Sequence, residues 1–448
     1  MNMPASTKRN TWIREGVWVS LGQGFSALGT LLGVRALTEF APPEVYGSVT
    51  LLLGFSMLIS GTLYTPIIQA GMRLYPEYVD GRVTQLRKAL FLMLMRRTLA
   101  GLVLIVFLWP LVSYFKPIPW LIYSLLVLLF MLEGLRSVET ALLNAARQQS
   151  ACAFMAVSEA WLRPVLAILA ILYIQAGELG IFVGYAVSTS LILIVYYIWS
   201  NKKGKTICFS SHPLPPDNSS VENNKLQIRI RDYAFPLIPL AVMGTVSGIG
   251  DRYIIGGLLG VDMAGIYAAA YGLVSRPFLM LAGAVEMTVR PIYNHHIARG
   301  QHTKAWSLLW RWLATMLGVC TLALGFIYLM RDELTAILLA KDYAKSSELL
   351  PWIAGGYCFL VLSHVFEKVC YAYGDTWLIL VIQTVGAIIG LLVAWQGIRL
   401  FGLIGAAMAV PVYFGMQMLI AMFAARVSWN HAKTRMPPEA EFPVIANS

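Results

Sequence analysis

Charged residues are scarce in this chain. Of its 448 residues, 13% are charged and 58% are hydrophobic. A soluble domain of this size could not cover so much apolar side chain with polar surface. Apolar runs of about 20 residues recur from end to end, and a helix of that length crosses the hydrocarbon core of a bilayer. The composition therefore excludes a soluble globular protein and predicts an all-α polytopic membrane protein.

The motifs of several common catalytic and metal sites are also missing. The five cysteines are scattered, without a Cys-x-x-Cys pair, as is typical of small buried apolar residues. There is no Gly-x-x-x-x-Gly-Lys-Ser/Thr loop, no His-Glu-x-x-His pair and no Gly-x-Ser-x-Gly elbow. These absences argue against an ATP-driven motor, a zinc site and a serine hydrolase. We expect no enzymatic activity, no cofactor and no metal.

The apolar runs predict twelve membrane-spanning helices. The first is expected to be retained, because Lys8, Arg9 and Arg14 precede a long apolar run that has no Ala-x-Ala-like cleavage site. The predicted spans are 15–38, 47–70, 90–114, 118–143, 151–174, 178–200, 234–259, 264–288, 306–331, 347–372, 376–397 and 402–425.

Basic residues gather on one side of the predicted membrane. The N-terminus, the tail and every second connection carry most of the Lys and Arg, whereas the opposite side holds few. The connection between the second and third spans contributes Arg73, Arg82, Arg87, Lys88, Arg96 and Arg97. Since cytoplasmic loops are enriched in Lys and Arg, both termini are expected in the cytoplasm. The same bias accounts for the net charge of +11, so we expect no nucleic-acid partner.

Two segments, 33–57 and 250–275, share one pattern. Each has an apolar helix end, a short connector with an acid, a glycine close to a tyrosine, and a new apolar helix. Placing Gly47 on Gly265 gives a shift of 218 residues, close to half the chain. With an even number of helices in each half, the halves should be parallel repeats. The predicted organisation is a six-helix lobe at 1–200, a solvated cytoplasmic linker at 201–233, a six-helix lobe at 234–425 and a cytoplasmic tail at 426–448.

Several ionisable residues fall inside predicted spans, where an uncompensated charge is costly. Arg136 can pair with Glu133 or Glu139, because spacings of three place all of them on one helix face. Glu159 and Arg163 are four residues apart and also share a face. The candidate basic residues of a cavity for an anionic cargo are Arg136, Arg163, Arg276, Lys368, His364 and Arg252. The candidate coupling or ion-pairing acids are Glu133, Glu139, Glu159, Asp251 and Glu367. The same spacing also fits pairs that only lock neighbouring helices.

Three stretches carry a resemblance to a known family. DRYIIGGLLGVDMAGIYAAAYGLVS at 251–275 resembles the "D-R…LG…GIYAAAY" stretch of polysaccharide-biosynthesis flippases (Wzx type) in the MATE-related MOP superfamily. LTEFAPPEVYGS at 37–48 resembles the matching first-half motif, with Phe-Ala-Pro-Pro here in place of the commoner Leu-Gly-Pro. ILLAKDYAKSSELLPW at 337–352 is similar to the outer segment that follows the family's ninth helix.

The resemblance implies a carrier with two parallel six-helix lobes around a central cavity that works by alternating access. Members of that family move undecaprenyl-pyrophosphate-linked oligosaccharide across the bacterial inner membrane. The cargo is an O-antigen unit of lipopolysaccharide or an exopolysaccharide repeat unit. The partners that it implies are the lipid-linked sugar diphosphate, membrane lipids, and a polysaccharide polymerase or assembly complex.

Two other functions are compatible with parts of the sequence pattern. A cation-coupled multidrug or metabolite antiporter of the same fold would favour buried acids, and Asp251 and Glu133 fit that requirement. A membrane-embedded glycosyltransferase or polymerase would need a large outer loop or catalytic acids in a loop, and no predicted outer loop is long enough.

Overall fold

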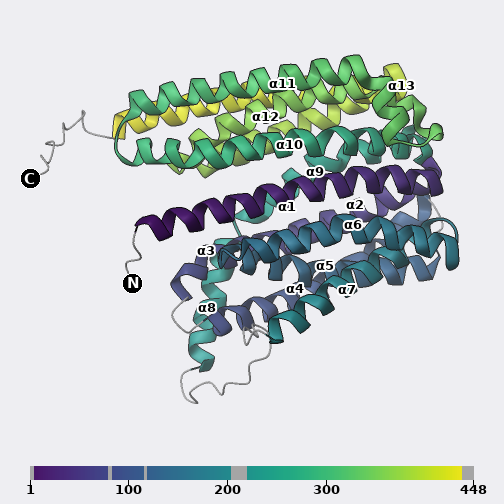
Figure 1. Cartoon of the computed structure of the whole chain (residues 1–448), viewed down its shortest axis with the longest axis horizontal. Coiled ribbons are helices and arrows are strands. Elements are labelled where there is room, and N and C mark those ends of the chain that lie inside the picture. The colour runs from purple at the N-terminus through teal and green to yellow at the C-terminus, as the bar shows by residue number, and fades with distance from the viewer. Residues whose placement is uncertain (1–4, 79–82, 116–118, 203–218, 436–448) are drawn as a thin grey trace, which may run out of the picture. The chain divides into compact units, whose positions relative to one another are not determined.

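The structure is a computed structural model, and it describes residues 5–78, 83–115, 119–202 and 219–435. All regular secondary structure in these ranges is helical (Figure 1). The elements are α1 (Ala5–Phe40), α2 (Pro43–Leu63), α3 (Thr65–Leu74), η1 (Tyr75–Tyr78), α4 (Val83–Phe115), α5 (Trp120–Ala145), α6 (Gln149–Tyr173), α7 (Glu178–Lys202), α8 (Ser219–Ala234), α9 (Leu237–Leu258), α10 (Val261–Ala298), α11 (His302–Leu338), η2 (Lys341–Glu348), α12 (Leu350–Tyr373) and α13 (Thr376–Arg435).

The helices confirm the predicted all-α membrane fold. In the described residues, nine helices are long and apolar enough to cross a membrane, or ten if the bent pair α8–α9 is one span. The predicted span 47–70 is split into α2 and α3, with Pro66 in the first turn of α3, where its missing N–H costs no helical hydrogen bond. The last two predicted spans lie within α13, which has a non-helical residue at Gly402 (φ 63°, ψ −140°). The number of twelve spans stays a prediction.

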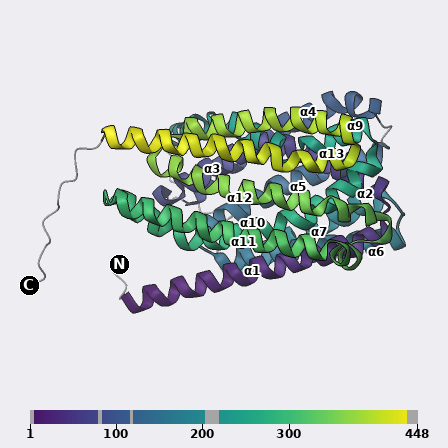
Figure 2. The ribbon, with the colours of Figure 1, turned by 90° about the horizontal axis from the view of Figure 1, so that it is seen from above.

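The chain forms two compact units. The first comprises Met1–Ala269 with Thr335–Ala344, and the second comprises Ala270–Leu334 with Lys345–Ser448. In the first unit, α1 lies along α6, and α7 packs against both α5 and α6 (Figure 1). In the second unit, α12 lies along α13 (Figure 2). The lobe boundaries predicted from the sequence stay a prediction.

The predicted linker is not unstructured throughout. Part of it, 203–218, lies outside the described residues, but its end forms α8. Leu226, Ile230 and Ala234 of α8 are buried in the core that α3 and α4 contribute to the first unit. The sequence pattern did not indicate this helix, because α8 is polar overall and buries only a narrow stripe of residues spaced four apart.

The segment between α11 and α12 is fastened to the start of the chain. The Tyr343 hydroxyl of η2 donates a hydrogen bond to the Ala41 backbone oxygen at 2.8 Å, and the Ala340 amide donates to Thr38 Oγ1 at 3.2 Å. Tyr343 is fully buried, and this burial raises the pKa of its hydroxyl. The segment therefore holds the turn between α1 and α2 in place.

The two glycines that define the internal repeat pack against each other. A β-carbon on Gly47 would lie 2.0 Å from the Val261 backbone oxygen, and one on Gly265 would lie 2.0 Å from the Pro43 backbone oxygen. Each glycine thus meets the residue four positions before the other. Such reciprocity is the mark of a two-fold related contact, and it supports the register that aligns Gly47 with Gly265.

Below this contact, α2 and α9 continue to pack closely. A β-carbon on Gly54 would lie 2.9 Å from the Tyr253 hydroxyl, and one on Gly61 would lie 2.8 Å from Thr245 Oγ1. The three glycines of α2 recur every seven residues, so they line one stripe of the helix. The Tyr253 hydroxyl also donates to the Leu51 backbone oxygen at 2.7 Å. This stripe, with its hydrogen bond, joins α2 to α9.

Replacing Gly47 by alanine should destabilise the protein. The new methyl group would collide with backbone rather than with a movable side chain, and overpacking of this kind costs about 1–3 kcal/mol. We expect a lower Tm for the purified full chain in detergent. The matched control is Gly257→Ala in α9, where a β-carbon meets nothing within 4 Å. Equal Tm values for the two variants would contradict the close approach.

Candidate functional site

Two glutamates and two arginines form a closed ring of ion pairs between α5 and α6. Arg136 Nη2 lies 2.7 Å from Glu133 Oε2 on the same helix, and its Nη1 lies 2.7 Å from Glu159 Oε2 on α6. Arg163 Nη1 lies 2.9 Å from Glu159 Oε1, and Arg163 Nη2 closes the ring by pairing with Glu133. Each charge therefore touches two charges of opposite sign.

The ring is accessible from one side and supported on another. Its four side chains are between 19% and 25% exposed, so none is sealed in the core. From α7, Thr189 lies within hydrogen-bond range of Arg163 at 3.4 Å, and the Tyr185 ring lies 5.5 Å from the guanidinium. The formal charge of the four groups is zero. Two guanidiniums are thus presented together with their charge compensated, which lowers the cost of placing them in a membrane.

Glu139, predicted as a partner of Arg136, pairs instead with Arg87 of α4. Both side chains are buried, at 6% and 5% exposed. The hydroxyls of Tyr196 and Tyr197 of α7 donate to the same carboxylate at 3.2 and 3.4 Å. Placing Arg87 in a cytoplasmic loop was wrong, because α4 begins at Val83 and carries Arg87 inward. The buried pair ties three helices together.

Asp251 and Arg252 lie on α9 in the first unit. The Tyr267 hydroxyl of α10 donates to Asp251 Oδ2 at 2.6 Å, and the Arg252 amide donates to Asp251 Oδ1 at 2.8 Å. Asp251 is 5% exposed and Tyr267 is fully buried. The carboxylate therefore joins α9 to α10, the helix that carries the repeated glycine Gly265.

The candidates in the second unit form a smaller set of contacts. Glu286 of α10 accepts from Lys368 of α12 at 2.9 Å and from Arg290 at 3.0 Å. Glu367 is buried and accepts from the Gln383 amide at 3.0 Å. His364 is half-buried on the same helix, and Arg276 of α10 is exposed. Among the described residues, no group of three His, Cys, Asp or Glu could hold a metal ion.

A separate basic pocket of about 300 Å³ lies between α4 and α8. Arg96, Arg97 and Arg231 line it, and Arg96 Nη1 donates to Gln227 Oε1 at 3.2 Å. The sequence had placed Arg96 and Arg97 among loop residues, but both lie within α4. The pocket was missed because its second wall, α8, was predicted to be a linker.

Comparison with protein families gives one match that covers most of the chain. A family described as polysaccharide biosynthesis protein matches residues 13–295. The chain belongs to this family. The resemblance seen in the 251–275 and 37–48 stretches is therefore confirmed. No curated protein matches this polysaccharide biosynthesis protein significantly.

Solved structures show the fold that this family member shares. An inward-facing multidrug resistance MATE family transporter of the MOP superfamily is 11% identical with a TM-score of 0.67, and the alignment covers 98% of this chain and 97% of that one. A MOP superfamily transporter from Pyrococcus furiosus is 12% identical with a TM-score of 0.65, covering 94% and 96%. A MATE transporter from Vibrio cholerae is 13% identical with a TM-score of 0.57, covering 94% and 99%.

The family and the fold together describe a multi-pass membrane protein with the fold of the matched transporters. The matched structures cover nearly the whole of both chains, so the likeness extends over both halves of the sequence. The family is one of polysaccharide biosynthesis proteins, and the fold is the one seen in the matched transporter structures.

The buried pair Arg87–Glu139 should contribute to stability. Arg87→Leu leaves a buried carboxylate without its cation, and breaking such a pair costs about 3–5 kcal/mol. Arg87→Leu combined with Glu139→Leu should recover most of the loss in Tm. The matched control is Arg73→Leu, whose exposed pair with Glu77 should contribute less than about 1 kcal/mol. A double variant as unstable as Arg87→Leu would contradict this account.

Proposed function

We propose that this protein is a flippase for an undecaprenyl-pyrophosphate-linked oligosaccharide, such as an O-antigen or exopolysaccharide repeat unit. It moves this cargo across the bacterial inner membrane by alternating access of two lobes, 1–200 and 234–425. The charge bias of the sequence supports cytoplasmic termini. A polysaccharide polymerase or assembly complex is the proposed partner on the export route.

The observation that carries the proposal is the pair of arginines in the α5–α6 ring. Arg136 and Arg163 bind the same two carboxylates, so their guanidiniums face a common space. A guanidinium binds phosphate oxygens with two parallel hydrogen bonds. A diphosphate has two anionic groups joined by one oxygen, which matches two adjacent guanidiniums. This chemistry suits the head of a lipid-linked sugar diphosphate.

The glutamates make this site usable in both its empty and its loaded state. Without cargo, Glu133 and Glu159 compensate the arginines, whose unpaired charge would be costly in a membrane. When a diphosphate arrives, it competes with the carboxylates for the same guanidinium N–H groups. Release of cargo is helped when the carboxylates return. The glutamates thus act as internal substitutes for the substrate's phosphates.

The candidate residues of the second unit extend this proposal. Lys368, Arg290 and Glu286 repeat the arrangement of cations held by a carboxylate. We assign Lys368, His364 and Arg276 to cargo contacts in the C-terminal lobe. Arg252 and Glu367 are assigned to positioning, since each lies beside buried polar contacts.

Neutralising the arginines and the glutamates should have opposite effects on binding. Arg136→Gln and Arg163→Gln should weaken binding of polyprenyl diphosphate about tenfold to a hundredfold, because a hydrogen bond to a charged group contributes about 1.5–3 kcal/mol. Glu133→Gln should bind it more tightly, because its competitor is removed, and should export glycan more slowly. The measurements are binding to the purified full chain and glycan export in cells.

The matched control is Arg35→Gln. Arg35 also pairs with a glutamate on its own helix, Glu39, but outside the ring. The Arg35→Gln variant should bind polyprenyl diphosphate as tightly as the unmodified protein does. Full glycan export by a folded Arg136→Gln/Arg163→Gln variant would overturn the proposal.

The second candidate function is a cation-coupled multidrug or metabolite antiporter of the same fold. The observation in its favour is the buried carboxylate of Asp251. The antiporter would be favoured by two results together. The protein would export organic cations and lose this efflux in Asp251→Asn, and glycan export would be unchanged in Asp251→Asn and in the ring variants. In our account Asp251 holds Tyr267 by a hydrogen bond. Asp251→Asn should therefore lower the Tm of the purified protein more clearly than it lowers glycan export.

A further inference from the structure

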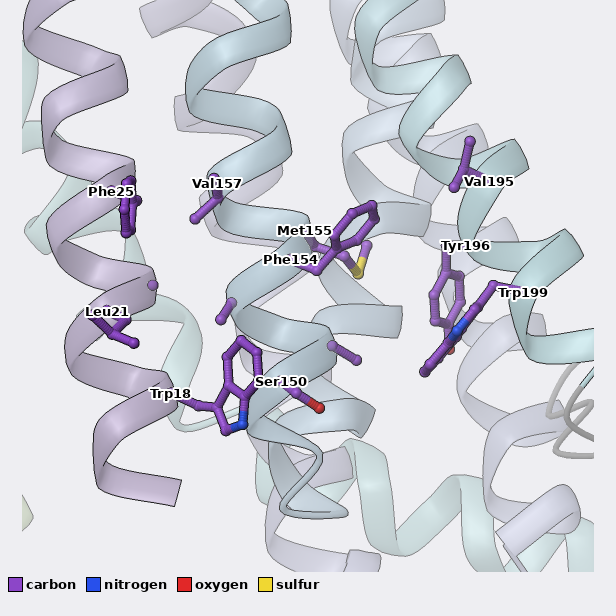
Figure 3. Close-up of a pocket in the computed structure, with 13 residues that line it drawn as sticks. Trp18, Leu21, Phe25, Ser150, Phe154, Met155, Val157, Val195, Tyr196 and Trp199 are labelled. Carbon is purple, nitrogen blue, oxygen red and sulfur yellow. The ribbon is translucent and has the colours of Figure 1, made fainter. Parts of the chain in front are cut away.

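An apolar groove of about 490 Å³ lies between α1, α6 and α7 of the first unit. Trp18 and Phe25 line it from α1, Phe154 and Met155 from α6, and Tyr196 and Trp199 from α7. Figure 3 shows the α1 residues on one side and Tyr196 and Trp199 on the other, with Phe154 between them. Its volume is within the range of about 300–1,000 Å³ that is usual for small-molecule sites.

The chemistry of the walls selects an apolar occupant. Among the residues whose side chains the structure describes, no charged residue lines the groove, and Ser150 and Tyr196 are the lining residues that carry a hydroxyl. Because α6 and α7 are membrane-spanning in length and composition, the groove lies within the bilayer, where the available ligands are hydrocarbon chains. A sugar would leave its hydroxyls without hydrogen-bond partners here, at a cost for each. The groove therefore fits the tail of an amphiphile.

The groove runs toward the end of α6 that lies away from the ion-pair ring. The lining residues come from the first turns of α6 and the last turns of α7, so the groove ends where α6 begins. Exposed Arg147 lies there, in the turn between α5 and α6 with φ 57°. This cation is on the side of the groove opposite to the ring, so a ligand whose head is bound at the ring arginines would extend its tail toward Arg147.

One wall of the groove shares a face of α6 with the ion-pair ring. Met155, Glu159 and Arg163 follow one another at spacings of four on α6, which places them on one face at steps of about 6 Å. The ring is therefore about one to two helical turns from the groove wall. Tyr196 holds the opposite wall of the groove in place, since its hydroxyl donates to the buried carboxylate of Glu139 on α5. A head bound at the ring can leave the first part of its tail in the groove.

The wall residues favour an isoprenoid over a saturated acyl chain. Five of the six residues named above are aromatic, and four of these, Trp18, Phe25, Phe154 and Trp199, are between 38% and 54% exposed. Aromatic rings offer large, rigid apolar surfaces against which the flat, branched units of an isoprenoid chain can pack. The Met155 thioether adapts to irregular, branched shapes.

We propose that this groove binds the polyisoprenoid tail of the lipid-linked sugar diphosphate while its head is at the arginines. This inference rests on the proposed function and names where the lipid part of that substrate is held. It makes α1, α6 and α7 the entry face for the tail.

The test fills the groove without disturbing the ring. Val195 lines the groove from α7 and is 47% exposed, so Val195→Trp adds bulk to the groove rather than to the core. The matched control is Val187→Trp, on the same helix and 44% exposed but outside the groove lining. Phe154→Ala is a second variant, which removes an aromatic side chain from the groove wall instead of filling the groove. Native mass spectrometry of the full chain measures retention of polyprenyl diphosphate and of phosphatidylglycerol.

We expect Val195→Trp and Phe154→Ala to weaken polyprenyl diphosphate retention about tenfold, a change of about 1.4 kcal/mol, while Val187→Trp changes nothing. Phosphatidylglycerol retention should be the same in all variants. Unchanged polyprenyl diphosphate retention in folded Val195→Trp overturns the inference, as does an equal loss of both lipids.

The outcome is distinct from that of the proposed function. If glycan export is independent of Arg136 while retention still depends on Val195, the flippase proposal fails and the groove remains a polyprenyl site. If export depends on Arg136 but polyprenyl diphosphate retention is unchanged in Val195→Trp, only the groove assignment fails and the flippase proposal stands.

Discussion

The cost of an unpaired charge inside a membrane is the constraint on which this structure depends. Hydrocarbon offers no water to solvate a guanidinium or a carboxylate, so each needs a partner within reach. The first unit meets this need in two ways. Arg87 and Glu139 are sealed in the core, where they tie helices together, whereas Arg136 and Arg163 remain partly accessible within a ring of two glutamates. Burial distinguishes a structural pair from one that can exchange partners.

Close backbone contacts hold other helices of the first unit together. The reciprocal packing of Gly47 and Gly265 brings α2 against the start of α10, and the glycine stripe of α2 continues along α9. Asp251 then fastens α9 to α10 through Tyr267, and Tyr343 fastens the turn that leads into α2. The repeat visible in the sequence thus becomes a pair of contacts related by two-fold symmetry.

The sequence was sufficient for the helices and for partners on one helix, but not for partners on different helices. Apolar runs located most spans, and spacing alone predicted Glu133–Arg136 and Glu159–Arg163, because residues three or four apart share a face. Periodicity does not say which helix a face meets, so the Arg136–Glu159 and Arg87–Glu139 pairs could not be foreseen. For the same reason α8 was taken for a linker: its three buried residues have a partner only in the folded core.

A double-mutant cycle between Arg136 and Glu159 tests the central claim most directly, namely that the glutamates substitute for the phosphates of the cargo. The coupling energy is obtained from Arg136→Gln, Glu159→Gln and the double variant, from thermal unfolding with and without saturating polyprenyl diphosphate. Residues in one ion-pair network couple by about 0.5–3 kcal/mol. The account predicts coupling in this range without ligand and its loss when the ligand is bound. Coupling that is unchanged by the ligand would contradict the exchange and leave the ring as a fixed brace between α5 and α6.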